Sequence, residues 1–120
     1  MKIRGISGIA KLADVKAPLT HPATGEVFGH LFGNVKNFEL HRAAFFVSAK
    51  ELVGEALYKA FLRKFCTGWD FVDDETGEPL AFNVDTVCEL SSGTGLTWVG
   101  IPFFEHMMDA KNFYCKPSKA

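Results

Sequence analysis

The sequence predicts an α+β fold, in which an N-terminal β-hairpin or small antiparallel sheet packs against about three α-helices. Three observations predict it. Short alternating segments rich in turn residues dominate the first third, an amphipathic helical pattern spans residues 48–65, and two shorter helical patterns follow. The 120 residues fit a single domain, mainly β over 1–38 and mainly α over 39–112, with a flexible tail at 113–120.

The hairpin is expected within Lys16–Gly33, after a half-buried strand at 3–10. Its turn is Pro22-Ala23-Thr24-Gly25, because proline fixes φ and glycine tolerates a positive φ. Val27–Phe32 is then the return strand. Since its glycines would weaken a central strand, we expect an edge or bulged strand.

The main helix is predicted to start at the capping box Ser48-Ala49-Lys50-Glu51 and to stop near Gly68. Its apolar face comprises Leu52, Val53, Ala56, Leu57, Ala60, Phe61 and Phe65. Gly54 inside it would cost about 1 kcal/mol relative to alanine and would allow close approach of another element. Residues 39–47 form either a short helix of their own or a lead-in to this one.

A second helix is predicted to begin at Asn83, a good N-cap, and to end by Ser91-Ser92-Gly93. Residues 94–100 form a turn-rich connection. The third helix is expected from about Pro102, which is favoured in a first helical turn, to near Asn112.

Composition argues against several classes of protein. The formal net charge of −1 gives no basic field for nucleic acid. No apolar run approaches the roughly 20 residues that a bilayer requires, and the N-terminus lacks the apolar core of a signal peptide. The three widely spaced cysteines indicate free thiols in a reducing compartment. We therefore expect a soluble, cytosolic protein with no membrane or nucleic-acid partner.

No pattern predicts catalysis, a cofactor or a metal. The acidic run between Asp70 and Glu78 lacks the ligand spacing of a calcium loop and is interpreted as a solvated turn. His21 and His30 could face each other across the hairpin with His41 nearby, but no carboxylate or cysteine accompanies them in the sequence. Cys66 is interpreted as a small core residue rather than a nucleophile. The chain is therefore not expected to be an enzyme.

Aromatic residues are abundant: twelve are phenylalanines, more than a small interior needs, so some should remain on the surface for a partner. The Phe- and Met-rich last helix has two interpretations: its apolar residues pack in the core, or they form an adaptable binding face. We assign Phe103, Phe104, Met107 and Met108 to a client-binding or self-association face.

The segment Thr67–Phe82 is the most informative stretch of the chain. Trp69, Phe71 and Phe82 are large apolar anchors around a polar tip at 73–77, an arrangement that folds a turn back onto a core. Trp69, Gly77, Pro79 and Phe82 are the residues to which we assign a structural role.

Two motifs in this order resemble the tail assembly chaperones of long-tailed (siphovirus-type) bacteriophages and prophages. The first, Leu19-Thr20-His21-Pro22-Ala23-Thr24-Gly25-Glu26, resembles a His-Pro-x-Thr-Gly-Glu opening. The second, Gly68–Phe82, is similar to a Gly-Trp-x-x-Val-x-Asp-x-x-Gly-Glu-Pro-x-x-Phe connector. A final helix ending in Ala110-Lys111-Asn112 completes a resemblance that spans most of the chain from Leu19.

The resemblance implies a non-enzymatic role. Such proteins bind the long helical tape measure protein, keep it soluble and help to bring tail tube protein to it. It further implies a location in the host bacterial cytoplasm and absence from the mature virion. We also expect the chain to self-associate into a homo-oligomer. The alternative is a structural virion component, such as a minor tail or head–tail joining protein.

Overall fold

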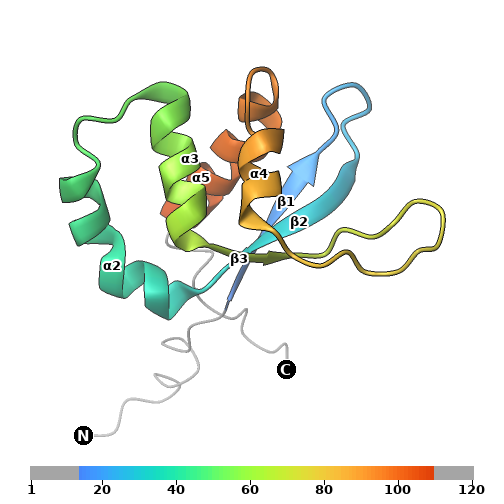
Figure 1. Cartoon of the computed structure of the whole chain (residues 1–120), viewed down its shortest axis with the longest axis horizontal. Coiled ribbons are helices and arrows are strands. Elements are labelled where there is room, and N and C mark those ends of the chain that lie inside the picture. Colours follow the sequence, from blue (N-terminus) through green and yellow to red (C-terminus); the bar gives the residue numbers. More distant parts are fainter. Residues whose placement is uncertain (1–13, 110–120) are drawn as a thin grey trace, which may run out of the picture.

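The computed structural model describes residues 14–109, which form a three-stranded antiparallel sheet and four α-helices (Figure 1). The elements follow in the order β1 (Val15–Thr20), β2 (Val27–Gly33), α2 (Val35–Ser48), α3 (Gly54–Phe65), β3 (Cys66–Trp69), α4 (Val84–Leu90), the π-helical turn η1 (Leu96–Gly100) and α5 (Ile101–Met108). The predicted α+β class with an N-terminal hairpin is confirmed. The predicted strand at 3–10 and tail at 113–120 lie outside the described residues.

The hairpin of β1 and β2 forms where the sequence predicts it. Gly25 has φ +74°, and the N–H of Gly25 donates to the carbonyl of His21 at 2.9 Å, which closes the turn. Along β1, Val15, Ala17 and Leu19 are buried while the residues between them are exposed. The buried face of the sheet packs against α5 and η1.

Of the two expectations for β2, an edge strand or a bulged strand, the first is wrong and the second agrees with its irregular register. The strand order is β1-β2-β3, so β2 is central and β3, which the sequence did not predict, pairs with its other side. Register shifts on both sides do make β2 irregular. One of its glycines has a packing role: a Cβ on Gly33 would lie 2.6 Å from Sδ of Met107. That glycine lets α5 approach the sheet closely.

The predicted capping box is also wrong. Ser48 is the last residue of α2, and its hydroxyl donates to the carbonyl of Phe45 at 3.0 Å. Residues 39–47 belong to α2, a helix of its own that starts at Val35, so the predicted β-to-α boundary at residue 38 lies inside it. The side chain of Asn34 caps α2 by accepting from the N–H of Asn37 at 2.8 Å.

Helix α3 begins later and ends earlier than expected. Gly54 is its first residue, with φ +58° and nothing within 4 Å of an added Cβ, so it serves a backbone conformation rather than close packing. The helix stops at Phe65, and Gly68 lies within β3 instead of ending the helix.

Helix α4 is confirmed at both ends. The Asn83 side chain accepts from the N–H groups of Asp85 and Thr86, and α4 ends at Leu90 just before Ser91. Residues 96–100 form η1 rather than simple turns, and α5 continues from it directly. The last helix ends at Met108 because Asp109 is extended, four residues short of the predicted end at Asn112.

The core centres on Phe61, which is fully buried in α3. Its ring lies within 4.8–6.3 Å, centroid to centroid, of six other phenylalanine rings from α2, α3 and α5. These are Phe38, Phe45, Phe46, Phe65, Phe103 and Phe104. Aromatic pairs of this kind add about 0.5–1.5 kcal/mol each beyond the area they bury.

We expect Gly95→Ala to destabilise the fold by about 2–3 kcal/mol, because its Cβ would lie 1.7 Å from the carbonyl oxygen of Leu90 and backbone would have to move. Gly93→Ala is the matched control, since the space around Gly93 is open and only its φ of +58° is strained, at about 1 kcal/mol. Urea denaturation measures both. Equal losses would contradict this packing.

Candidate partner-binding surface

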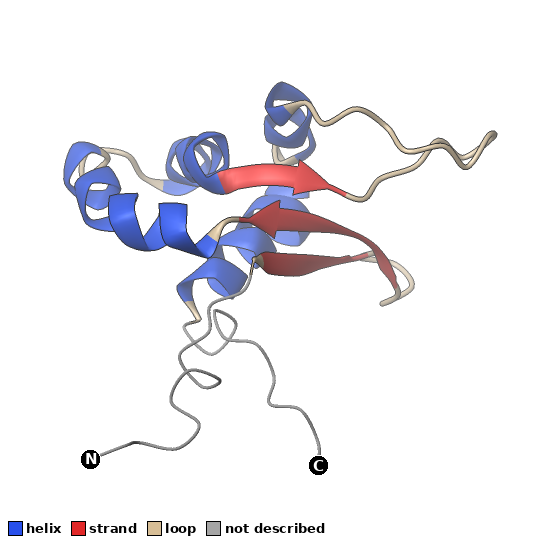
Figure 2. Cartoon of the chain, turned by 90° about the horizontal axis from the view of Figure 1, so that it is seen from below, coloured by secondary structure: helices blue, strands red, loops and turns tan. Residues whose placement is uncertain are grey.

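The segment between β3 and α4, residues 70–82, forms a two-stranded arm. It projects from the same end of the molecule as the β1–β2 turn (Figures 1 and 2). An isolated antiparallel bridge joins Val72 to Pro79, and the N–H of Leu80 donates to the carbonyl of Phe71 at 2.9 Å. The predicted fold-back of this segment is therefore confirmed.

The tip of the arm is closed by Asp73. Its Oδ1 accepts from the N–H groups of Glu75 at 2.8 Å and Thr76 at 3.0 Å, an aspartate turn. Those two hydrogen bonds, with Thr76 the larger contributor, lower the pKa of the Asp73 carboxyl. Gly77 supplies the positive φ of +71° that the return strand requires.

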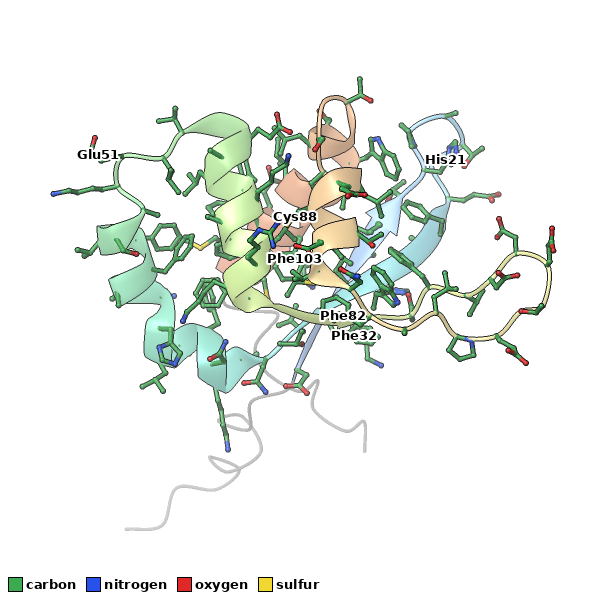
Figure 3. The ribbon with its side chains drawn as sticks, viewed as in Figure 1. His21, Phe32, Glu51, Phe82, Cys88 and Phe103 are labelled. Carbon is green, nitrogen blue, oxygen red and sulfur yellow. The ribbon has the colours of Figure 1, made fainter. Side chains whose placement is uncertain are left out.

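The base of the arm is held by Trp69. Its indole N–H donates to the carbonyl of Leu80 at 2.8 Å, and its ring packs against Phe71 at 4.9 Å and edge-on against Phe82 at 5.3 Å. Figure 3 labels Phe82 where the arm meets α4. All four residues predicted to be structural, Trp69, Gly77, Pro79 and Phe82, lie in this framework.

Asp70 fastens the arm to the sheet. Its carboxylate accepts from the backbone N–H of His30 at 2.6 Å through Oδ1, and its Oδ2 lies 2.8 Å from Nδ1 of the same histidine. Both side chains are about two-fifths exposed, at 37% for His30 and 42% for Asp70, so a partner could reach them.

A continuous row of aromatic rings, here called the aromatic ladder, links η1, β2, β3 and the arm. It runs from Trp98 to Phe28 at 5.4 Å, from Phe28 to Phe71 at 6.1 Å, and on through Trp69 to Phe82. Phe28 is 44% and Phe82 38% exposed. The ladder therefore holds the arm in place while presenting aromatic surface to solvent.

Along the sequence, the arm and the segments that follow it carry charged side chains of one sign, and of these Asp85 is paired with Arg63 of α3. Between Cys66 and Asp109 the sequence contains nine acidic residues and no lysine or arginine. The nine are Asp70, Asp73, Asp74, Glu75, Glu78, Asp85, Glu89, Glu105 and Asp109. Five of them lie on the arm, next to the exposed side chains of Val72 and Leu80. Such a surface suits a partner helix that carries apolar and basic side chains. This stretch without basic residues is the sequence signal that could have located the surface.

The four residues of the last helix that were predicted to form a partner-binding face do not share one exposed face. Phe103 and Met107 are fully buried, and Figure 3 shows Phe103 inside the body of the protein. Phe104 packs against the rings of Phe46, Tyr58 and Phe61. Met108 is 43% exposed. In this conformation, therefore, Phe103 and Met107 have no surface for a partner, and α5 chiefly fills the core.

His21, His30 and His41 do not come together at the hairpin. Nδ1 of His21 accepts from the N–H of Ala23 in the turn, His30 contacts Asp70, and His41 lies on α2. Within residues 14–109, no three His, Cys, Asp or Glu side chains come together in a way that could hold a metal ion.

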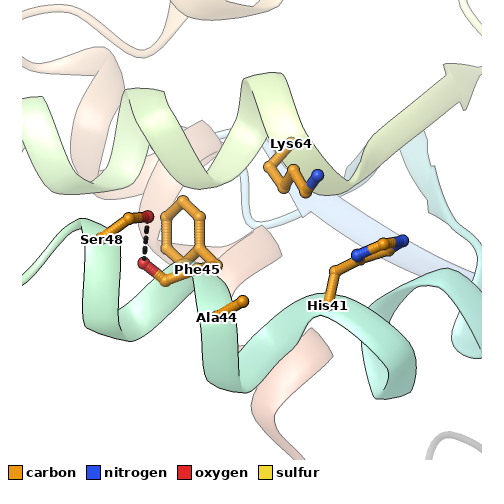
Figure 4. A pocket seen from close by; sticks show the side chains of 5 residues that line it. All are labelled: His41, Ala44, Phe45, Ser48 and Lys64. Carbon is orange, nitrogen blue, oxygen red and sulfur yellow. Dashed lines mark hydrogen bonds between the residues drawn. The ribbon is translucent and has the colours of Figure 1, made fainter.

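A shallow pocket of about 310 Å³ lies between α2 and α3 (Figure 4). Its lining comprises His41, Ala44, Phe45, Ser48 and Lys64. The Ser48 hydroxyl already donates to a backbone carbonyl, and the lining includes neither a carboxylate nor a thiol. The pocket thus lacks a nucleophile with a base to activate it.

The two described thiols are core groups, as predicted for Cys66. Cys66 is 6% and Cys88 3% exposed. Burial raises the pKa of Cys66 to about 12 and also raises the pKa of Cys88. Because the thiolate is the reactive form, neither group is set up as a nucleophile.

None of the helices within residues 14–109 has the length and apolarity that crossing a bilayer requires. Comparisons of the chain with protein-family models, curated proteins and solved structures find no match.

We expect the thiols of a Cys115→Ser variant to react with Ellman's reagent at least roughly hundredfold more slowly in the folded protein than in denaturant. The reason is the burial of Cys66 and Cys88 and their raised pKa values. Absorbance at neutral pH measures the rate. A fast reaction of one thiol in native buffer would contradict the packing at that cysteine.

We expect Asp73→Ala to speed hydrogen exchange at the Gly77 and Leu80 amides roughly tenfold, since the turn loses its acceptor. Asp73→Asn, which keeps an acceptor oxygen, and Asp74→Ala are the controls. Because the folded pKa of Asp73 is lowered, its contribution is complete above its ordinary pKa of 3.8 and disappears as pH falls through the lower folded value. Equal protection in all variants would contradict this role of Asp73.

Proposed function

We propose that this protein is a non-enzymatic tail assembly chaperone of a long-tailed bacteriophage or prophage. Its client is the tape measure protein, to which it helps to bring tail tube protein. It acts in the host bacterial cytoplasm and leaves before the virion is complete. The motif resemblance from Leu19 to Asn112 supports this choice of family.

One observation carries the proposal. The connector motif of the resemblance, Gly68–Phe82, is the same segment that builds the arm and most of the aromatic ladder. The residues that suggest the family therefore also make the exposed apolar and acidic surface. A motif that maps to an exposed surface rather than to the core points toward binding.

The chemistry of that surface suits an aggregation-prone helical client. Phe28, Leu80 and Phe82 offer apolar contact area, while the five carboxylates of the arm repel other copies of the same surface. A client helix with lysine or arginine beside its apolar face would bind both through apolar contact and through attraction to the carboxylates. Among the described residues, the pocket and the thiols offer no catalytic arrangement that competes with this interpretation.

The alternative is a structural virion component, such as a minor tail or head–tail joining protein. An exposed apolar and acidic surface would serve a permanent contact equally well. Mass spectrometry of purified virions distinguishes the two: the chaperone is absent from them and the structural component is present.

The proposal is tested by co-expression with the tape measure protein of the same phage or prophage. We expect a soluble complex whose yield falls at least roughly tenfold when Phe28→Asp interrupts the ladder or when Asp74→Lys and Glu75→Lys reverse the charge of the arm. Circular dichroism verifies that each variant is folded.

The matched control is Glu39→Lys with Glu55→Lys, which makes the same charge change on α2 and α3, away from the arm. This control should retain the complex. Loss in the control alone, or tape measure protein that stays insoluble with the wild-type chain, would count against the arm as the client surface.

A further inference from the structure

Helix α2 has apolar residues on two opposite faces. Its inner face, with Phe38 and Phe45, packs against Phe61. Its outer face carries a stripe formed by Leu40, Ala43, Ala44 and Val47, all exposed. At 100° per residue, the stripe lies about 180° from the inner face. Leu40 is 75% and Val47 70% exposed, which is unusual for two large aliphatic residues two turns apart on one helix face.

No other part of residues 14–109 covers this stripe. The helix lies at one end of the molecule and the arm at the other (Figure 1). The neighbouring loop adds exposed Leu52 and Val53 at the C-terminal end of α2. A stripe with spacings of three and four residues over two turns is the pattern by which one helix packs along another.

We propose that a second copy of this chain covers the stripe, with the two α2 helices antiparallel about a two-fold axis. The order along the stripe is large, small, small, large, so it matches itself when reversed. The antiparallel register places Leu40 against Val47 of the other copy, while Ala43 and Ala44 each lie beside their own counterparts next to the two-fold axis. Small residues at the centre allow the helix axes to approach closely, while the large residues fill the ends.

Charge favours the same register and opposes the parallel one. Lys36 lies one turn before Leu40 on the stripe, and Glu51 follows the helix one turn after Val47. Antiparallel pairing sets Lys36 of each copy beside Glu51 of the other, with helix dipoles opposed. Parallel pairing would set Lys36 against Lys36. The dimer thus has an isologous interface, in which both copies use one patch.

The interface is short. A 14-residue helix is about 21 Å long, so the contact falls at the small end of stable protein interfaces. We therefore expect a dimer that dissociates on dilution in the micromolar range. The stripe does not include the arm, so its test requires no tape measure protein and its outcome is independent of the proposed function.

Sedimentation velocity across a dilution series tests the dimer. We expect Val47→Glu to weaken self-association at least roughly tenfold, because it buries a charge in the pair. Val72→Glu is the matched control, the same substitution at a half-exposed valine on the arm, and should dimerise like the wild type. A monomeric wild type at the highest concentration, or equal affinities for the two variants, would overturn the proposal.

The register is tested by cysteines placed on the stripe in a Cys115→Ser background, with Cys66 and Cys88 protected by burial. Under mild oxidation, Ala43→Cys should form a disulfide-linked dimer, and Leu40→Cys should couple to Val47→Cys rather than to itself. Lys36→Glu should weaken the dimer and adding Glu51→Lys should restore it. A Leu40→Cys homodimer, or no rescue of Lys36→Glu, would overturn the antiparallel pairing.

Discussion

The packing of rings around Phe61 is the interaction on which the arrangement of the helices depends. Phe61 is the place where α2, α3 and α5 meet, through Phe45 from one side and Phe103 from the other. Because α2 makes few other contacts with the body, this aromatic cluster fixes which of its two faces is turned inward. The outer stripe of α2 is exposed because the opposite face of the helix packs against this cluster.

The arm depends on a second and weaker set of constraints. Its strands are too short to be stable alone, since an isolated hairpin is marginal in water. The indole of Trp69 closes the base of the arm, while the Asp70 carboxylate and the ladder to Trp98 attach it to elements far away in sequence. Holding the arm in this way requires aromatic rings at the surface. The residues that stabilise the arm therefore also give it an exposed apolar face.

The sequence predicted correctly those features that form through contacts between residues close together along the chain. The Asn83 cap, the turn at Gly25 and the tip of the arm each form through contacts within a few residues, and each was predicted. Strand β3 was missed because its four residues pair with β2, more than thirty positions earlier. The Ser48 capping box failed because the same residues also fit the end of α2. The burial of Phe103 and the ladder depend on tertiary packing, which no spacing rule reveals.

The two proposed surfaces have a joint consequence because they lie at opposite ends of one chain (Figure 1). Pairing through α2 would leave both arms free and pointing away from the two-fold axis. A dimer of this kind can hold two segments of one long helical client at once, and the second binding event becomes intramolecular. Weak affinity at each arm then suffices for retention along the client, while each single contact remains easy to release. A transient chaperone requires that combination, and a permanent virion component does not.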